Sequence, residues 1–317
     1  MLSSRKAFGG ILGLTLILSA PARAAEPSKY VPADAVLVIH VNVQQLLDSN
    51  LVRKYALPPL EQALTKNKRN EEVQQVLKGL GLDPAKDIHS ITVSTAVKDS
   101  DKILVSLRGK FNLDKIHATA QKVAGDKKDS FKISKAGDKS LYEVTQQGKT
   151  VYAGVADEGT LLASPSRDYV ADALGSKTGK ISQELANAVA AADGKQSIWA
   201  VAVVTDGVKT FLGQRQEAAG LVSKLKAVCA GINVSDALAV SLKVQTTDPQ
   251  AARELGKQAN DAKAVLQFVG QTNEELKPFT DEIVKTLEIK TQQADVNVKF
   301  QLSQDLIEKA IKKVPGQ

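Results

Sequence analysis

The chain has 317 residues, of which 43% are hydrophobic and 24% are charged, and its formal net charge at pH 7 is +7. This composition is typical of a globular protein and excludes a largely disordered chain. Aromatic residues make up only 4% of the chain. Surfaces that stack carbohydrate or single-stranded nucleic acid rely on exposed rings, so this content argues against both.

Residues 1–24 predict a cleavable secretory signal peptide. Arg5 and Lys6 form a cationic start, residues 11–18 form an apolar run, and the small residue Ala24 precedes the expected cleavage site. The apolar run is shorter than the roughly 20 residues needed to span a bilayer, and no second run of that length follows. We therefore expect an exported protein of the periplasm or the cell exterior, with no transmembrane segment in the mature chain.

The first part of the mature chain predicts strands that alternate with helices. A β-branched run at residues 35–43 indicates a buried strand, and the helical stretch that begins at residue 44 is interrupted by Pro58 and Pro59. Further strands are expected at 88–97, 103–111, 131–134, 141–145, 150–155 and 160–164. Further helices are expected at 60–64, 71–77, 112–124 and 166–174, with Asn112 as the cap of the third.

Residues 175–180 are rich in Gly and Lys and indicate a linker. After it we expect strands at 197–204, 237–245, 288–290 and 295–302. Helices are expected at 182–192, 208–228, from 248 onward, at 274–287 and at 303–313. Asp248 before Pro249 indicates the start of a long helix, because a proline at the first helical position has no amide hydrogen to leave unpaired.

Two strands share a sequence pattern, since residues 103–108 and 238–243 have Val, Ser, Leu and a final basic residue in the same places. Each is followed by a capped amphipathic helix. We therefore expect an α+β fold with two similar halves, each a mainly antiparallel sheet with helices packed on one face. Residues 25–180 would form the first domain, and residues 181–317 a second domain that is a diverged duplicate.

The mature chain opens with the motif YVPADA at residues 30–35, followed by a hydrophobic strand and a helix. In this it resembles a broad group of exported bacterial proteins of unknown function. The resemblance implies export and an α+β architecture. It implies no activity and no site residues.

The histidines do not form a recognisable site in the sequence. His40 lies in an expected strand, His89 begins one, and His117 lies in an amphipathic helix. No pair has the spacing of a metal site. Strand order is unknown at this point, so whether the three converge in space stays open.

The only cysteine, Cys229, excludes an internal disulfide bond. It is expected at the apolar end of a helix as a small buried hydrophobic residue. A reactive thiol is the alternative and needs a cation held beside it; Lys224 and Lys226 are near in sequence.

Other motifs favour ordinary structural roles. No nucleophile motif is found, and residues 175–180 lack the earlier glycine of a phosphate loop. The acidic pairs Asp99 with Asp101 and Asp157 with Glu158 fall in expected turns. The short basic clusters at 66–69 and 127–128 adjoin acidic residues, so nucleic acid is not expected as a partner.

No catalytic, cofactor-binding or metal-binding residue is therefore assigned. The function that we favour is a non-enzymatic binding or structural protein of the cell envelope, with another envelope protein or macromolecule as its partner. A hydrolase with a spatially assembled site and a carrier of an apolar ligand remain alternatives. Convergence of His40, His89 or His117 with a carboxylate in one cleft would favour the hydrolase, and a dry internal pocket would favour the carrier.

Overall fold

The computed structural model describes residues 29–59, 79–96, 101–175, 179–213 and 220–312. The strands are β1 (Leu37–Asn42), β2 (Ile88–Thr95), β3 (Ile103–Gly109), β4 (Phe131–Ala136), β5 (Lys139–Gln146), β6 (Lys149–Asp157), β7 (Thr160–Ser164), β8 (Ile198–Val203), β9 (Leu225–Val234), β10 (Ala237–Thr246), β11 (Glu288–Gln292) and β12 (Asp295–Ser303). The helices are α1 (Val43–Asp48), the π-helix η1 (Val52–Ala56), α4 (Pro84–Asp87), α5 (Leu113–Asp126), α6 (Arg167–Leu174), α7 (Gln183–Ala191), α8 (Asp206–Gly213), α10 (Pro249–Thr272), α11 (Lys277–Thr286) and α12 (Gln304–Lys312).

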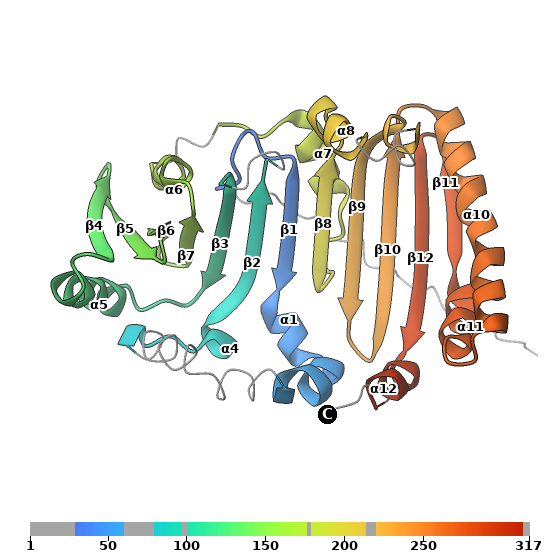
Figure 1. Cartoon of the computed structure of the whole chain (residues 1–317), viewed down its shortest axis with the longest axis horizontal. Coiled ribbons are helices and arrows are strands. Elements are labelled where there is room, and N and C mark those ends of the chain that lie inside the picture. Colours follow the sequence, from blue (N-terminus) through green and yellow to red (C-terminus); the bar gives the residue numbers. More distant parts are fainter. Residues whose placement is uncertain (1–28, 60–78, 97–100, 176–178, 214–219, 313–317) are drawn as a thin grey trace, which may run out of the picture.

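All twelve strands belong to one antiparallel sheet, in the order β11-β12-β10-β9-β8-β1-β2-β3-β7-β6-β5-β4 (Figure 1). The prediction of two similar halves with separate sheets is wrong, because β1 pairs directly with β8 and Val38 lies opposite Val201. Both strands are apolar and unbroken, so each accepts a neighbour along either edge. The sequence pattern gave each strand but not its partner.

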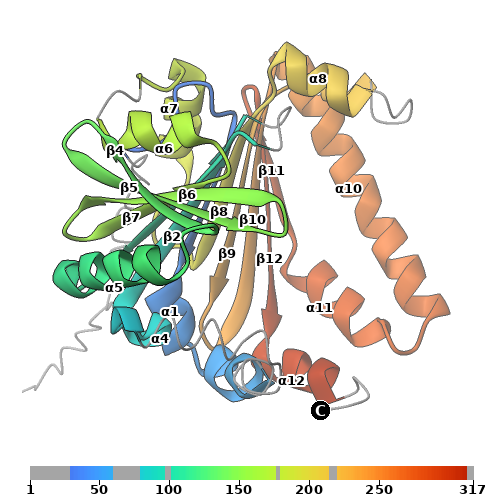
Figure 2. The same ribbon diagram turned by 60° about the vertical axis from the view of Figure 1, so that its left-hand side comes forward.

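Helices cover both faces of the sheet, which corrects the prediction that they pack on one face. We name the faces after one helix each. The α7 face carries Val38 and Val201, which pack against Leu185 of α7, and α6 also lies on it. The α10 face carries Val244 and Val296, which pack against Ala252 of α10. Figure 2 shows α6 and α7 on one side of the sheet and α10 and α11 on the other.

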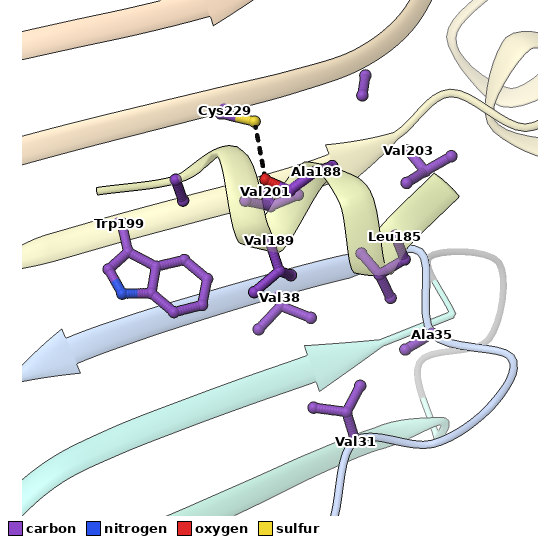
Figure 3. Close-up of a cluster of buried hydrophobic side chains, with 12 residues drawn as sticks. Val31, Ala35, Val38, Leu185, Ala188, Val189, Trp199, Val201, Val203 and Cys229 are labelled. Carbon is purple, nitrogen blue, oxygen red and sulfur yellow. Dashed lines mark hydrogen bonds between the residues drawn. The ribbon is translucent and has the colours of Figure 1, made fainter. Parts of the chain in front are cut away.

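The core beneath α7 is built from both sides of the predicted domain boundary at residue 180 (Figure 3). Val31, Ala35 and Val38 come from the first predicted domain. The other members come from the second: Leu185, Ala188, Val189, Ala192, Trp199, Val201, Val203, Ala227 and Cys229. One contiguous hydrophobic cluster therefore joins the two segments, in addition to the pairing of β1 with β8.

Local sequence signals placed several helix starts correctly. The side chain of Asn112 accepts a hydrogen bond from the backbone N–H of Lys115 at 3.0 Å, and that of Asp248 accepts one from Ala251 at 2.8 Å. Each cap satisfies an amide that the first helical turn leaves without a partner. The predictions of α5 and α10 from their caps are confirmed.

The predicted helix at 208–228 is wrong over its last part. Helix α8 ends at Gly213, and residues 225–234 form β9. This strand is hydrogen-bonded to β8 on one edge and β10 on the other. Its small and apolar residues read as one continuous run, and such a run does not distinguish a helix from a buried strand.

Some predictions lie outside the described residues. These are the signal peptide at 1–24, the helices at 60–64 and 71–77, the basic cluster at 66–69, the turn residue Asp99 and the centre of the linker at 176–178. Over the residues that the structure describes, no helix combines the length and the apolar character that crossing a membrane requires.

The start of the described chain is fixed to the end of β6. The hydroxyl of Tyr30 donates a hydrogen bond to Asp157 at 2.7 Å, and Lys29 forms an ion pair with the same carboxylate at 3.1 Å. Burial alone would raise the pKa of Asp157. Hydrogen bonds from Tyr30, Thr160 and Lys29 outweigh it and hold this pKa well below its usual range.

We expect Asp157→Asn to lower the free energy of unfolding at pH 7 by about 1 kcal/mol, a modest value because the carboxylate is partly exposed. A depressed pKa stabilises the fold above the unfolded-state pKa of about 4 and loses this effect as the pH falls towards the folded-state pKa. The difference between the variant and the wild type should therefore shrink below about pH 4. Urea unfolding across this pH range measures it. Asp138→Asn, in the exposed turn after β4, is the matched control; an equal loss there would contradict the role of Asp157.

Candidate functional site

The three histidines lie in separate settings. His40 of β1 is on the α7 face, where its ring stacks on Trp199 with centroids 5.2 Å apart. His117 of α5 forms a hydrogen bond with the hydroxyl of Tyr142, in the cluster beneath α5. His89 lies in β2 at a register shift. A histidine-centred hydrolase would need a histidine beside a carboxylate. The ring of His40 instead hydrogen-bonds to the hydroxyl of Thr92 at 3.0 Å.

Burial lowers the pKa of His40, and the charge of Arg108 lowers it further. Both effects favour the neutral form of the ring. Ser106 is in register with Thr92, and its hydroxyl is buried without a hydrogen-bond partner in the described part of the chain. These side chains are held in a packed row of the sheet, not in an open cleft.

Cys229 is in β9, not at the end of a helix, and it is buried as predicted. Its thiol donates to the backbone oxygen of Ala188 at 3.4 Å (Figure 3). Burial raises the pKa of this thiol and outweighs the opposite effect of Lys243. The cation beside Cys229 is thus Lys243 across the strand pair, not the sequence neighbours Lys224 and Lys226.

The acidic pair and the basic cluster that are fully described lie in turns or on the surface. Asp157 and Glu158 are at the turn between β6 and β7, where Asp157 also accepts the amide of Gly159. Among the residues that the structure describes, no group of three or more His, Cys, Asp or Glu side chains could hold a metal ion. Lys127 and Lys128 are exposed after α5.

An apolar row runs across the α10 face of the sheet. It crosses seven adjacent strands, and each member lies opposite the next in the strand register. The row consists of Leu107, Ile91, Val41, Ile198, Ile232, Val240 and Phe300. Every member is half-buried, and none belongs to or packs on a hydrophobic cluster of the described residues.

A second apolar row runs beside the first. Its members outside the clusters are Val105, Val93, Ile39, Ala200 and Ala230, and the row then continues beneath α10. We call these twelve residues the open apolar surface. In Figure 1 the strands that carry it face the viewer, between α5 at one end of the sheet and α10 and α11 at the other.

The opposite side of the same strands shows that this chain does place polar residues where the sheet faces water. On the α7 face, beyond α7, β10 carries Ser241 and Lys243, and β12 carries Asn297 and Lys299. Antiparallel sheets with one solvated face show this alternation. The apolar composition of the α10 face is therefore the one expected where a sheet is covered by another surface and does not face water.

The α7 face also holds a half-open groove of about 760 Å³. It lies between the end of α7 and the start of β11, over β9, β10 and β12. Three lysines, Lys243, Lys285 and Lys299, line it together with Asp193 and Glu288. These charges distinguish the groove from the dry apolar pocket that a lipid carrier would need.

Sequence reasoning missed both features because each depends on strand order. Ile198 and Ile232 belong to one row only because β8 pairs with β9, and β9 was not predicted. The alternation in 237–245 was visible, since Ser241 and Lys243 alternate with Val240 and Leu242. It indicated one polar and one apolar face for β10, but not how far either face extends.

No family model matches the chain, no curated protein matches it, and no solved structure matches its fold.

Proposed function

We propose that the chain is an exported, non-enzymatic binding protein and that it binds a protein partner through the open apolar surface. The observation that carries this proposal is the seven-strand apolar row, which is half-buried and lies outside every hydrophobic cluster of the described residues. Large apolar surfaces of this kind typically mark interaction sites. Export rests on the sequence of residues 1–24.

The size of the surface supports a protein partner. Seven adjacent strands span six spacings of about 4.8 Å, so the row is roughly 29 Å across. Standard protein interfaces are of this scale, with about 800 Å² buried on each partner. A single acyl chain would cover only a narrow part of this width, so the surface fits a lipid carrier less well.

Threonine substitutions test the surface without removing strand propensity, because threonine is β-branched. We expect the triple variant Val41→Thr, Ile198→Thr and Ile232→Thr to bind an apolar dye, anilinonaphthalene sulfonate, several-fold less than the wild type. Ile133→Thr with Val144→Thr is the matched control. These two residues are exposed apolar positions of the sheet that lie outside the open apolar surface.

A photoreactive amino acid at position 198 identifies what covers the surface in cells that make the protein. We expect an adduct with a second protein whose yield falls in the variant with threonine at 41 and 232 and not in the control variant. Adducts formed only within the chain would show that the protein covers its own surface, and the proposal would then be wrong. Equal adduct yields in the variant with threonine at 41 and 232 and in the control variant would also contradict the proposal.

A further inference from the structure

The groove on the α7 face has the size of a small-molecule site. Its volume of about 760 Å³ falls within the range of pockets that hold such ligands, roughly 300–1,000 Å³. The floor is the backbone of β9, β10 and β12, and the wall at one end is the segment that follows α7. The groove lies on the α7 face and the open apolar surface on the α10 face, although Ala230, Val240 and Phe300, which belong to strands that both sites share, also line the groove.

A glycine opens the groove at its α7 end. A Cβ atom at Gly231 would lie 2.7 Å from the hydroxyl oxygen of Ser241 and 3.0 Å from Cγ of Gln196. Gln196 therefore rests directly over the strand at this point, which only a residue without a side chain permits. The side chain of Gln196 and strand β9 together form one wall of the groove.

That wall offers an acceptor without a donor. Oε1 of Gln196 is buried and has no hydrogen-bond partner within the described residues. Nε2 of the same amide points to a carboxylate oxygen of Asp193 at 3.5 Å, so reversing the amide would bring two acceptors together. Buried polar atoms are normally hydrogen-bonded, and an N–H or O–H of a ligand would satisfy this one once the side chain of Gln196 turns towards the groove, since Oε1 is covered in the present arrangement.

The other wall is cationic. Lys243 is paired with Asp295 at 2.8 Å, and Glu288 is paired with Lys290 at 2.9 Å. Lys285 and Lys299 have no ion pair within 4 Å in the part of the chain that the structure describes, although Lys299 lies opposite Glu288 in the strand register.

The two walls are separated by a distance that a small molecule can bridge. Lys299 lies opposite Ser241, and Ser241 lies opposite Gly231. The backbone of Lys299 is thus two strand spacings, or about 10 Å, from that of Gly231, over which the side chain of Gln196 lies. Because lysine side chains are long, a ligand has to span less than this backbone distance.

We propose that this groove binds an acidic amino acid or a short peptide that contains one. The ammonium or amide N–H would donate to Gln196 beside Asp193, and the carboxylates would pair with Lys285 and Lys299. A neutral sugar fits less well, because Trp199 is only 4% exposed and its ring already stacks on His40. The fluorescence of this tryptophan, which lines the groove, provides a readout of binding.

Titration calorimetry of the whole mature chain tests the ligand class with L-glutamate and the dipeptide Ala-Glu as probes. We expect saturable binding of at least one of them at low salt, weakened by added salt. Glutarate, which lacks the ammonium, and L-glutamine, which lacks the second carboxylate, should bind at least 10-fold more weakly. Saturable binding of neither probe would overturn the proposal, and so would equal affinity for all four compounds.

Single substitutions test the two walls. Lys299→Gln and Lys285→Gln should each weaken binding of the better probe about 10-fold, whereas Lys226→Gln, outside the groove, should not. Gln196→Leu removes the unsatisfied acceptor, so it should weaken binding while leaving the unfolding midpoint unchanged or raised. Affinity unaffected by all three groove variants would place the ligand elsewhere and contradict the proposal.

Discussion

Gly109→Ala should be among the most destabilising single-methyl changes in this protein, with a loss of about 3 kcal/mol in the free energy of unfolding. Gly109 ends β3, and a Cβ atom there would lie 2.0 Å from the backbone oxygen of Asp87. That oxygen already accepts a hydrogen bond from the amide of Lys110 at 2.8 Å. The backbone at Gly109 and at Asp87 cannot move apart without breaking the pairing of β2 with β3. Any relief of the clash therefore costs hydrogen bonds between these strands.

Gly125→Ala is the control for this prediction. Gly125 lies in α5, and a Cβ atom there would meet no heavy atom within 4 Å. Alanine is the better helix former, so this change should leave the stability unchanged or raise it by up to about 1 kcal/mol. Urea unfolding monitored by circular dichroism compares the two variants. A loss below about 0.5 kcal/mol for Gly109→Ala would show that β3 ends differently from the geometry described above.

Much of the secondary structure could be predicted from local signals. The caps Asn112 and Asp248 use side chains that bond to amides three residues away, so a short window of sequence contains all that is needed. The strand at 237–245 was visible for the same reason, since alternation is a property of neighbours in the chain. Strand β9 was missed because Ala227, Cys229 and Gly231 are small and buried between two other strands, and such a segment lacks a distinguishing period.

The assembly of the sheet could not be predicted in the same way. The pairing of Val38 with Val201 joins residues far apart in the sequence, and nothing in either strand specifies the other. The candidate binding surfaces depend on that assembly. Ile198 and Gln196 are close in sequence, yet Ile198 belongs to the open apolar surface on one face and Gln196 lines the groove on the other.

The continuous sheet makes a further prediction about cooperativity, since residues 25–180 and 181–317 were expected to be separate domains. Leu141 is fully buried in β5, in the cluster beneath α6, and Leu141→Ala should cost about 2–5 kcal/mol. Trp199 is the only tryptophan and lies in β8, six strands away in the sheet. We expect the thermal midpoint reported by Trp199 fluorescence to fall by about 5–10 °C in this variant, together with the midpoint from circular dichroism.

The reason for this expectation is that two kinds of contact cross residue 180. Hydrogen bonds join β1 to β8, and the cluster around Trp199 includes Val31 and Val38 from the first segment. If the first segment unfolded alone, β8 would lose its neighbour and Trp199 would lose part of its packing, so its fluorescence should report the event. Val144→Ala, at a 40% exposed position of the same strand as Leu141, should move neither midpoint by a comparable amount. If the circular dichroism midpoint fell in Leu141→Ala while the Trp199 midpoint stayed fixed, the two segments would be independent domains despite their shared sheet.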